Sequence, residues 1–221
     1  MDKWTATGPA VATRRPSLTL FPFGLTTEPA HHYSSWEEKP KPRSTGGEDG
    51  RHPGQKAREL IRYVSERCEA DRHFGATKLN KILFFADFLF YQKSGRSITG
   101  QDYQRLPSGP APRLLPVRQT LVDAGDLAVR ERLTHGRTQL RTIAIREVDL
   151  SGFGGDEIAV VDHVIRVLWD HSAAEASDLS HTLTGWRLAR DGETIPYETV
   201  FLSERKLTQE EADYALQLVA A

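Results

Sequence analysis

Residues 82–91 constrain this chain most, because nine of the ten are apolar or aromatic and only Asp87 is charged. Their surroundings predict a helix over residues 78–93, with Thr77 as its N-cap and Gly95 as a left-handed C-cap. A helix that is apolar on every side has to be buried on most of them. At ~16 residues it is too short for a membrane span, which takes ~20 apolar residues. The sequence therefore predicts a central buried helix and no membrane segment.

Proline marks a division of the chain near residue 54. Seven of the 12 prolines precede that point, and residues 37–54 are dominated by Lys, Glu, Pro, Arg, Gly and Asp. Proline opposes regular structure, and so polar a segment buries too little apolar surface to offset its ordering entropy. We expect a flexible tail over residues 1–54 and one domain over residues 55–221. Apolar residues within 18–25 leave open a docking role for the tail.

The rest of the chain is expected to be a compact, mainly α-helical domain with a small β-hairpin. Apolar periodicity predicts further helices at residues 56–70, 113–123, 155–170, 173–181 and from 208 onward, with Ser172, Thr208 and Glu211 as capping residues of the last two. Extended runs at 127–133 and 140–145 flank His135-Gly136 and predict an antiparallel hairpin. Residues 98–112 and 186–201 are expected to be irregular or loosely ordered.

No pattern of catalytic, cofactor-binding or metal-binding residues emerges. The single cysteine, Cys68, excludes an intramolecular disulfide and a multi-cysteine zinc site. None of the eight histidines has HExxH spacing, and the sequence contains no nucleophile elbow, phosphate loop or dinucleotide-binding motif. We therefore expect no catalytic residues, no cofactor and no metal. A hydrolase is kept only as a distant third hypothesis.

Asp87 stands alone among apolar residues of the predicted central helix. A buried carboxylate needs a charge partner or several hydrogen-bond donors, or it stays protonated. We interpret Asp87 as half of a structural ion pair or as the acceptor that holds a loop such as residues 101–105. A binding or catalytic role is the alternative.

A helix at 113–123 followed by a hairpin resembles the recognition helix and wing of a winged-helix DNA-binding module. Residues 111–146 hold seven basic and three acidic residues, a net charge of +4 that suits phosphate contacts. A structural hairpin with a solvated basic face explains the same pattern. Residues 147–221 carry a net charge of −10, and an acidic face there would suit a basic protein partner. DNA is the less favoured partner and stays open.

Four blocks of sequence resemble, in order and spacing, the motifs of the SocA-like Panacea antitoxin family. The first block is the predicted helix Lys-Leu-Asn-Lys-Ile-Leu-Phe-Phe-Ala-Asp, which contains Lys78, Asn80, Lys81 and Asp87. The second is an Ile-Thr-Gly segment followed by Tyr103. The third is the turn Gly109-Pro110, and the fourth is the pair Ser180-His181 followed by Trp186. An Ile-Pro-Tyr tail at residues 195–197 agrees as well. The resemblance spans about residues 55–218. It departs from the family at Ser108, where an aromatic residue is usual.

This resemblance implies that the protein is the antitoxin of a type II toxin–antitoxin pair, encoded by a bacterium or a phage. Such an antitoxin neutralises a protein toxin by direct contact in the cytoplasm. The resemblance also implies that a neighbouring gene encodes the toxin. It implies a second mode of action, in which the antitoxin delivers the toxin to the ClpXP protease. It implies neither catalysis nor a cofactor. The alternative function is a winged-helix-like transcriptional regulator. We expect one structural region to be shaped by Asp87, Tyr103, Gly109, Pro110, Ser180, His181 and Trp186, with their toxin contacts left open.

Overall fold

A computed structural model describes residues 53–134, 137–202, 208–210, 213 and 216–217 of the chain. The expected tail lies outside these residues except for its last two positions, and so do the hairpin turn His135-Gly136 and Glu211, the expected capping partner of Thr208. Within the described residues, the predicted fold class is confirmed: helices dominate, and the β structure is limited to two small antiparallel pairs of strands. None of the described helices is long and apolar enough to cross a membrane.

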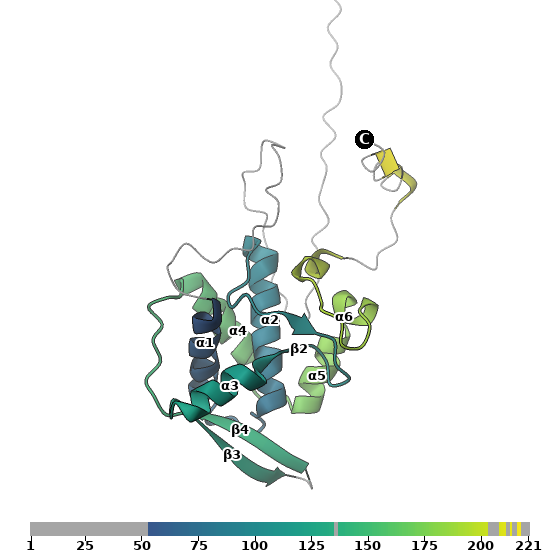
Figure 1. Cartoon of the computed structure of the whole chain (residues 1–221). Coiled ribbons are helices and arrows are strands. Elements are labelled where there is room, and N and C mark those ends of the chain that lie inside the picture. Colours follow the sequence, from purple (N-terminus) through teal and green to yellow (C-terminus); the bar gives the residue numbers. More distant parts are fainter. Residues whose placement is uncertain (1–52, 135–136, 203–207, 211–212, 214–215, 218–221) are drawn as a thin grey trace, which may run out of the picture.

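Helix α2 (Ala76–Ser94) runs through the middle of the molecule (Figure 1). Every residue from 82 to 90 is buried, which confirms the prediction made from the apolar run. Three helices, α1 (Pro53–Arg67), α4 (Gly155–Leu168) and α5 (Ala173–His181), contact α2. The core is therefore built around one helix, as its composition requires.

The two ends of α2 were predicted with unequal success. Gly95 is the left-handed C-cap with φ of 74°, and its N–H donates to Tyr91 O over 2.8 Å, as expected. The prediction for Thr77 was wrong, because Gly75 is the N-cap and Thr77 lies inside the helix. A Cβ on Gly75 would lie 3.0 Å from the side chain of Gln139 and 3.2 Å from Leu140 O, so a larger residue would fit only if the hairpin shifted slightly.

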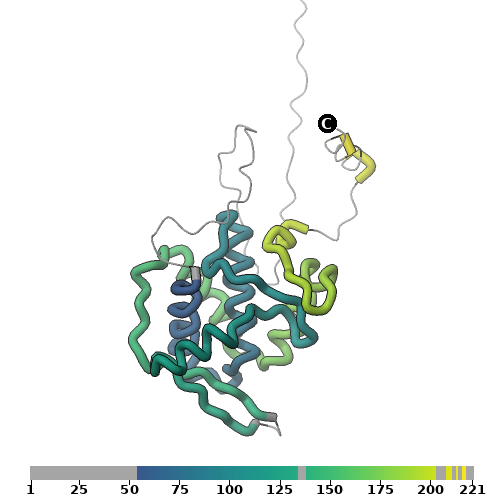
Figure 2. The backbone as a smooth tube through the Cα atoms, in the orientation of Figure 1, coloured from purple at the N-terminus to yellow at the C-terminus, as the bar shows by residue number. Residues whose placement is uncertain are grey.

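The predicted hairpin forms from β3 (Leu127–Thr134) and β4 (Arg137–Ala144), which pair antiparallel in register. It follows α3 (Leu114–Asp123) and lies at one end of the helical body, as the backbone path in Figure 2 shows. Strand β4 packs on α1, where the hydroxyls of Ser65 and Thr142 are 2.6 Å apart. The order of helix and hairpin that resembles a winged helix is therefore present.

The chain after α4 contains more helix than the sequence indicated. Ser172 caps α5, accepting from Glu175 N–H over 3.2 Å, as predicted. The segment expected to be loose holds α6 (Thr184–Leu188) and a 3-10 helix, η1 (Tyr197–Phe201). Each has five residues, too few for a helical period to show in the sequence. The expected irregular segment at 98–112 contributes only β1 (Tyr103–Gln104) and β2 (Ala111–Pro112), which pair with each other.

Candidate functional site

Lys78 fastens the start of α2 to the end of α4. Its Nζ donates to Asp71 Oδ2 over 2.5 Å, to Trp169 O over 2.7 Å and to His171 O over 2.8 Å. The last carbonyls of a helix lack partners within the helix and carry partial negative charge, so a buried ammonium satisfies them well. Lys78 is fully buried. Its contacts are those of a structural residue.

Asp87 holds the loop between α2 and β1. Its Oδ1 accepts from the N–H groups of Ile98 and Thr99, each over 2.8 Å. Its Oδ2 accepts from the Thr99 hydroxyl and, over 2.6 Å, from the Tyr103 hydroxyl. Complete burial raises the pKa of Asp87, while these four hydrogen bonds favour the carboxylate and oppose that shift. Asp87 is thus the acceptor that holds a loop, which is one of the two structural interpretations made from the sequence. The donors begin at Ile98, three residues before the loop 101–105 given there as an example.

Tyr197 extends this arrangement from η1 and was not singled out from the sequence. Its hydroxyl donates to Gln101 O over 2.6 Å and lies 3.5 Å from Asp87 Oδ2. Its ring stacks on Tyr91 with centroids 5.2 Å apart. Burial, together with the Asp87 charge, raises the pKa of Tyr197. The Ile-Pro-Tyr tail was the one sequence signal that could have found it.

Lys81 is buried one turn after Lys78 and donates to Pro110 O over 2.8 Å. No carboxylate pairs with it in the part of the chain that the structure describes. Burial lowers the pKa of Lys81 to about 7, because a desolvated ammonium is costly without a counter-charge. Gly109 has φ of 92°, and a Cβ there would lie 2.4 Å from Ser180 Oγ and 2.8 Å from Lys81 Nζ. Only glycine fits this close approach.

Trp186 joins α6 to the end of α5 and to the loop after β1. Its ring stacks on His181 with centroids 4.0 Å apart, and the Arg105 guanidinium lies 4.4 Å from the Trp186 ring centroid. Trp186 Nε1 donates to Leu106 O over 3.3 Å, and Arg105 pairs with Asp191. Burial and the nearby Lys81 charge lower the pKa of His181. Sequence reasoning missed Arg105, and no signal in the motif blocks marks it.

The structure brings most of the motif residues into one region beside α2. The Asp87–Tyr103 pair and the cluster around Lys81 are linked by the β1–β2 ladder, in which Tyr103 stands opposite Pro112. Lys78 lies apart from them, at the start of α2. Asn80 is half-buried and takes no part in these contacts. The region therefore serves to hold two loops and the short helix α6 on the central helix.

Chemistry by these residues would need access that the structure does not give. A lysine with a pKa near 7 is suited to proton transfer, yet Lys81 is 1% exposed. Cys68 is also 1% exposed, and burial raises the pKa of its thiol to about 12. Over the described ranges, no three His, Cys, Asp or Glu side chains gather as metal ligands do. The arrangement instead offers a rigid scaffold beneath the half-buried pair of Trp186 and Arg105.

The lowered pKa of Lys81 predicts a pH-dependent stability. Above pH 7 the folded chain holds Lys81 neutral, whereas the unfolded chain keeps it protonated up to about 10.5. Since the unfolded state binds the extra proton, the free energy of unfolding rises with pH, by up to about 1.4 kcal/mol per unit. Between pH 7.0 and 8.5 we expect a gain of about 1–2 kcal/mol in urea denaturation.

Lys81→Met is the matched comparison for this effect, because it keeps the length of the side chain and removes the titrating group. Between pH 7.0 and 8.5, the free energy of unfolding of this variant should rise by about 1–2 kcal/mol less than that of the wild type. Parallel pH profiles for the two proteins would show that Lys81 has an ordinary pKa in the folded chain.

Comparison with known families places most of this region in one domain. A family model described as antitoxin SocA-like, Panacea domain, matches residues 79–187. The match runs from α2 to α6 and includes every motif residue named above except Lys78 and Tyr197. Comparisons with curated proteins and with solved structures gave no match.

Proposed function

Residues 79–187 are a Panacea domain of the SocA-like antitoxin family, and on this premise we propose that the protein is the antitoxin of a type II toxin–antitoxin pair. It binds its toxin directly, and this neutralisation needs no catalysis by the chain. The family match is the observation that carries the proposal. The partner is a protein toxin encoded by a neighbouring gene.

The structure supports this proposal with a surface suited to binding. We define the Trp186 face as Trp186 together with the half-buried and exposed residues that contact its side chain, which are Arg105, Leu106 and His181. Tryptophan and arginine are the residue types that most often dominate the energy of protein interfaces. Trp186 is held by ring stacking and by a hydrogen bond, so little side-chain freedom is lost when a partner binds.

The segment that carries Trp186 also has a net charge that favours a basic partner. Residues 173–202 include five acidic and two basic residues, a net charge of −3. Among the acidic ones, Asp178, Asp191, Glu193 and Glu198 are exposed. Such a field speeds the encounter with a positively charged protein and lowers the affinity for a negatively charged one.

Co-expression tests the function. The neighbouring gene should arrest growth when it is induced alone, and induction of this protein should restore growth. Toxin levels followed during rescue separate the two modes of action. A constant toxin level indicates neutralisation by binding alone, whereas a loss that requires ClpXP indicates delivery to that protease. Growth that stays arrested despite soluble, folded protein would contradict the proposal.

A pair of similarly exposed apolar residues tests the contact face. Leu106, in the loop after β1, is 36% exposed and belongs to the Trp186 face, whereas Val129 on β3 is 37% exposed and does not. Leu106→Asp places a charge in the Trp186 face and should weaken toxin binding at least tenfold, with loss of rescue. Val129→Asp should change the dissociation constant less than twofold. Equal effects of the two variants would remove the Trp186 face as the binding surface.

The alternative, a winged-helix-like DNA-binding regulator, has less support. The order α3–β3–β4 is present, but some arginines of this segment form hydrogen bonds with other parts of the fold. Arg141 donates to the carbonyls of Asp71 and Glu69 over 3.0 and 2.7 Å. Phosphate contacts would rest on the other arginines of residues 111–146, of which Arg146 also lies 3.7 Å from Asp126.

A further inference from the structure

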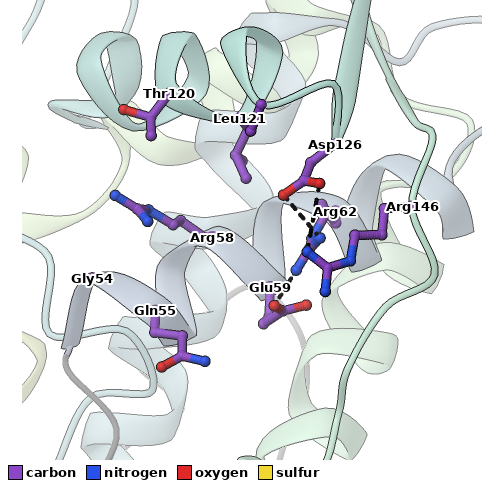
Figure 3. A pocket seen from close by; sticks show the side chains of 10 residues that line it. Gly54, Gln55, Arg58, Glu59, Arg62, Thr120, Leu121, Asp126 and Arg146 are labelled. Carbon is purple, nitrogen blue, oxygen red and sulfur yellow. Dashed lines mark hydrogen bonds and ion pairs between the residues drawn. The ribbon is translucent and has the colours of Figure 1, made fainter.

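A cavity of about 390 Å³ lies between α1, α3 and the segment that follows β4 (Figure 3). It is on the side of α2 away from α5 and α6, and so away from the Trp186 face (Figure 1). Three arginines line it, Arg58 and Arg62 from α1 and Arg146 from the segment after β4. The volume falls in the range of small-molecule sites, about 300–1,000 Å³.

The start of α1 adds positive potential to this cavity. Gly54 and Gln55, in the first turn of this 15-residue helix, line the cavity. Unpaired N–H groups and the helix dipole favour an anion at this position. The first turn of α1 itself contains no acidic residue.

Arg62 gives an independent indication of a missing acceptor. Its side chain is 5% exposed; its Nη2 donates to Glu59, and its Nη1 lies 3.3 Å from Asp126 Oδ2. Its Nε is buried and has no hydrogen-bond partner among the described residues. A buried guanidinium N–H without an acceptor is costly and uncommon in native proteins.

The other two arginines are available to an outside anion. Arg146 lies 3.7 Å from Asp126 and is 69% exposed, whereas Arg58 is exposed and forms no ion pair within the described ranges. Figure 3 shows Arg62 and Arg146 both reaching Asp126, while Arg58 points away from this network. Arg62 engages both carboxylates of the cavity, Glu59 and Asp126, and Arg146 also approaches Asp126; three guanidinium groups against two carboxylates leave a net positive charge.

We propose that this cavity binds a phosphate monoester of a small molecule about the size of a mononucleotide. Guanidinium groups match phosphate oxygens with paired hydrogen bonds, and the double negative charge suits a site with two available arginines and a helix N-terminus. The buried Leu121 supplies an apolar wall for the rest of the ligand. This site is independent of toxin binding, so either proposal stands if the other fails.

Calorimetric titration of the full chain tests the site. The probes are the four ribonucleoside 5′-monophosphates, ribose 5-phosphate and inorganic phosphate. At least one monoester should bind saturably, with a dissociation constant below 1 mM and at least tenfold below that of inorganic phosphate. The double variant Arg58→Gln/Arg146→Gln should weaken this binding at least tenfold, and because both side chains are exposed, its melting temperature should stay unchanged.

Arg130→Gln/Arg132→Gln is the matched control, because it removes the same charge from exposed positions of the hairpin outside the cavity. It should change affinity less than twofold. The proposal is overturned if no monoester binds, if inorganic phosphate binds as tightly as every monoester, or if both double variants behave alike. Competition by glutamate at equal strength would also overturn it, since the site would then be one for carboxylates.

Discussion

Asp87→Ala is expected to lower the free energy of unfolding by about 3–5 kcal/mol. The substitution leaves two buried N–H groups, of Ile98 and Thr99, and two hydroxyls without their acceptor. An unsatisfied buried donor costs about 1–3 kcal/mol, and water entering the vacated space offsets part of the total. Urea denaturation followed by circular dichroism measures the change.

Two further variants separate the hydrogen bonds of Asp87 from its charge. Asp87→Asn keeps an acceptor for the two N–H groups and places an amide donor near Tyr103, so its loss should be intermediate. Asp102→Ala removes an exposed carboxylate from the adjacent loop and should stay within about 0.5 kcal/mol of the wild type. A loss below 1 kcal/mol for Asp87→Ala would show that this carboxylate does not hold the loop.

Lys78→Met is expected to be about as destabilising, by about 3–5 kcal/mol. It leaves the 3%-exposed Asp71 as a buried charge without its partner and removes the donor from two carbonyls at the end of α4. Breaking one side of a buried ion pair costs this much because the remaining charge stays desolvated. Thermal and urea denaturation should both report the loss.

Lys93→Met, on the exposed last turn of α2, is the matched control and should change stability by less than about 0.5 kcal/mol. Asp71→Asn should partly rescue Lys78→Met, since it removes the uncompensated charge. The double variant would then be more stable than the sum of the single losses predicts. Simple additivity would mean that Lys78 acts only through the carbonyls of α4.

The features that were predictable from the sequence are those set by neighbouring residues. The apolar run at 82–91 requires a helix that is buried on most sides, and a lone Asp87 within it requires a charge partner or several donors, such as those of a nearby loop. Gly95 and Ser172 end and begin helices through turn and capping chemistry that spans four residues or fewer. Each of these inferences needs only local spacing.

What the sequence did not reveal depends on contacts between distant segments. The carbonyl acceptors of Lys78 lie 91 and 93 residues along the chain, and the cation–π partner of Trp186 lies 81 residues before it. Gly75, the N-cap of α2, lies against Gln139 and Leu140 of the hairpin, more than 60 residues further along the chain. The cavity lined by Arg62 brings α1 together with segments more than 50 residues away. The residue spacing within a single helix or strand does not reveal these long-range contacts.

Direct binding is the most decisive measurement for the proposed antitoxin activity. The purified protein and the purified product of the neighbouring gene should be combined in a calorimeter near 150 mM salt. We expect a saturable interaction with a dissociation constant below 1 μM, weakened at least tenfold by Leu106→Asp and unchanged by Val129→Asp. Absence of binding at 50 μM of each protein, while co-expression still restores growth, would contradict neutralisation by direct contact.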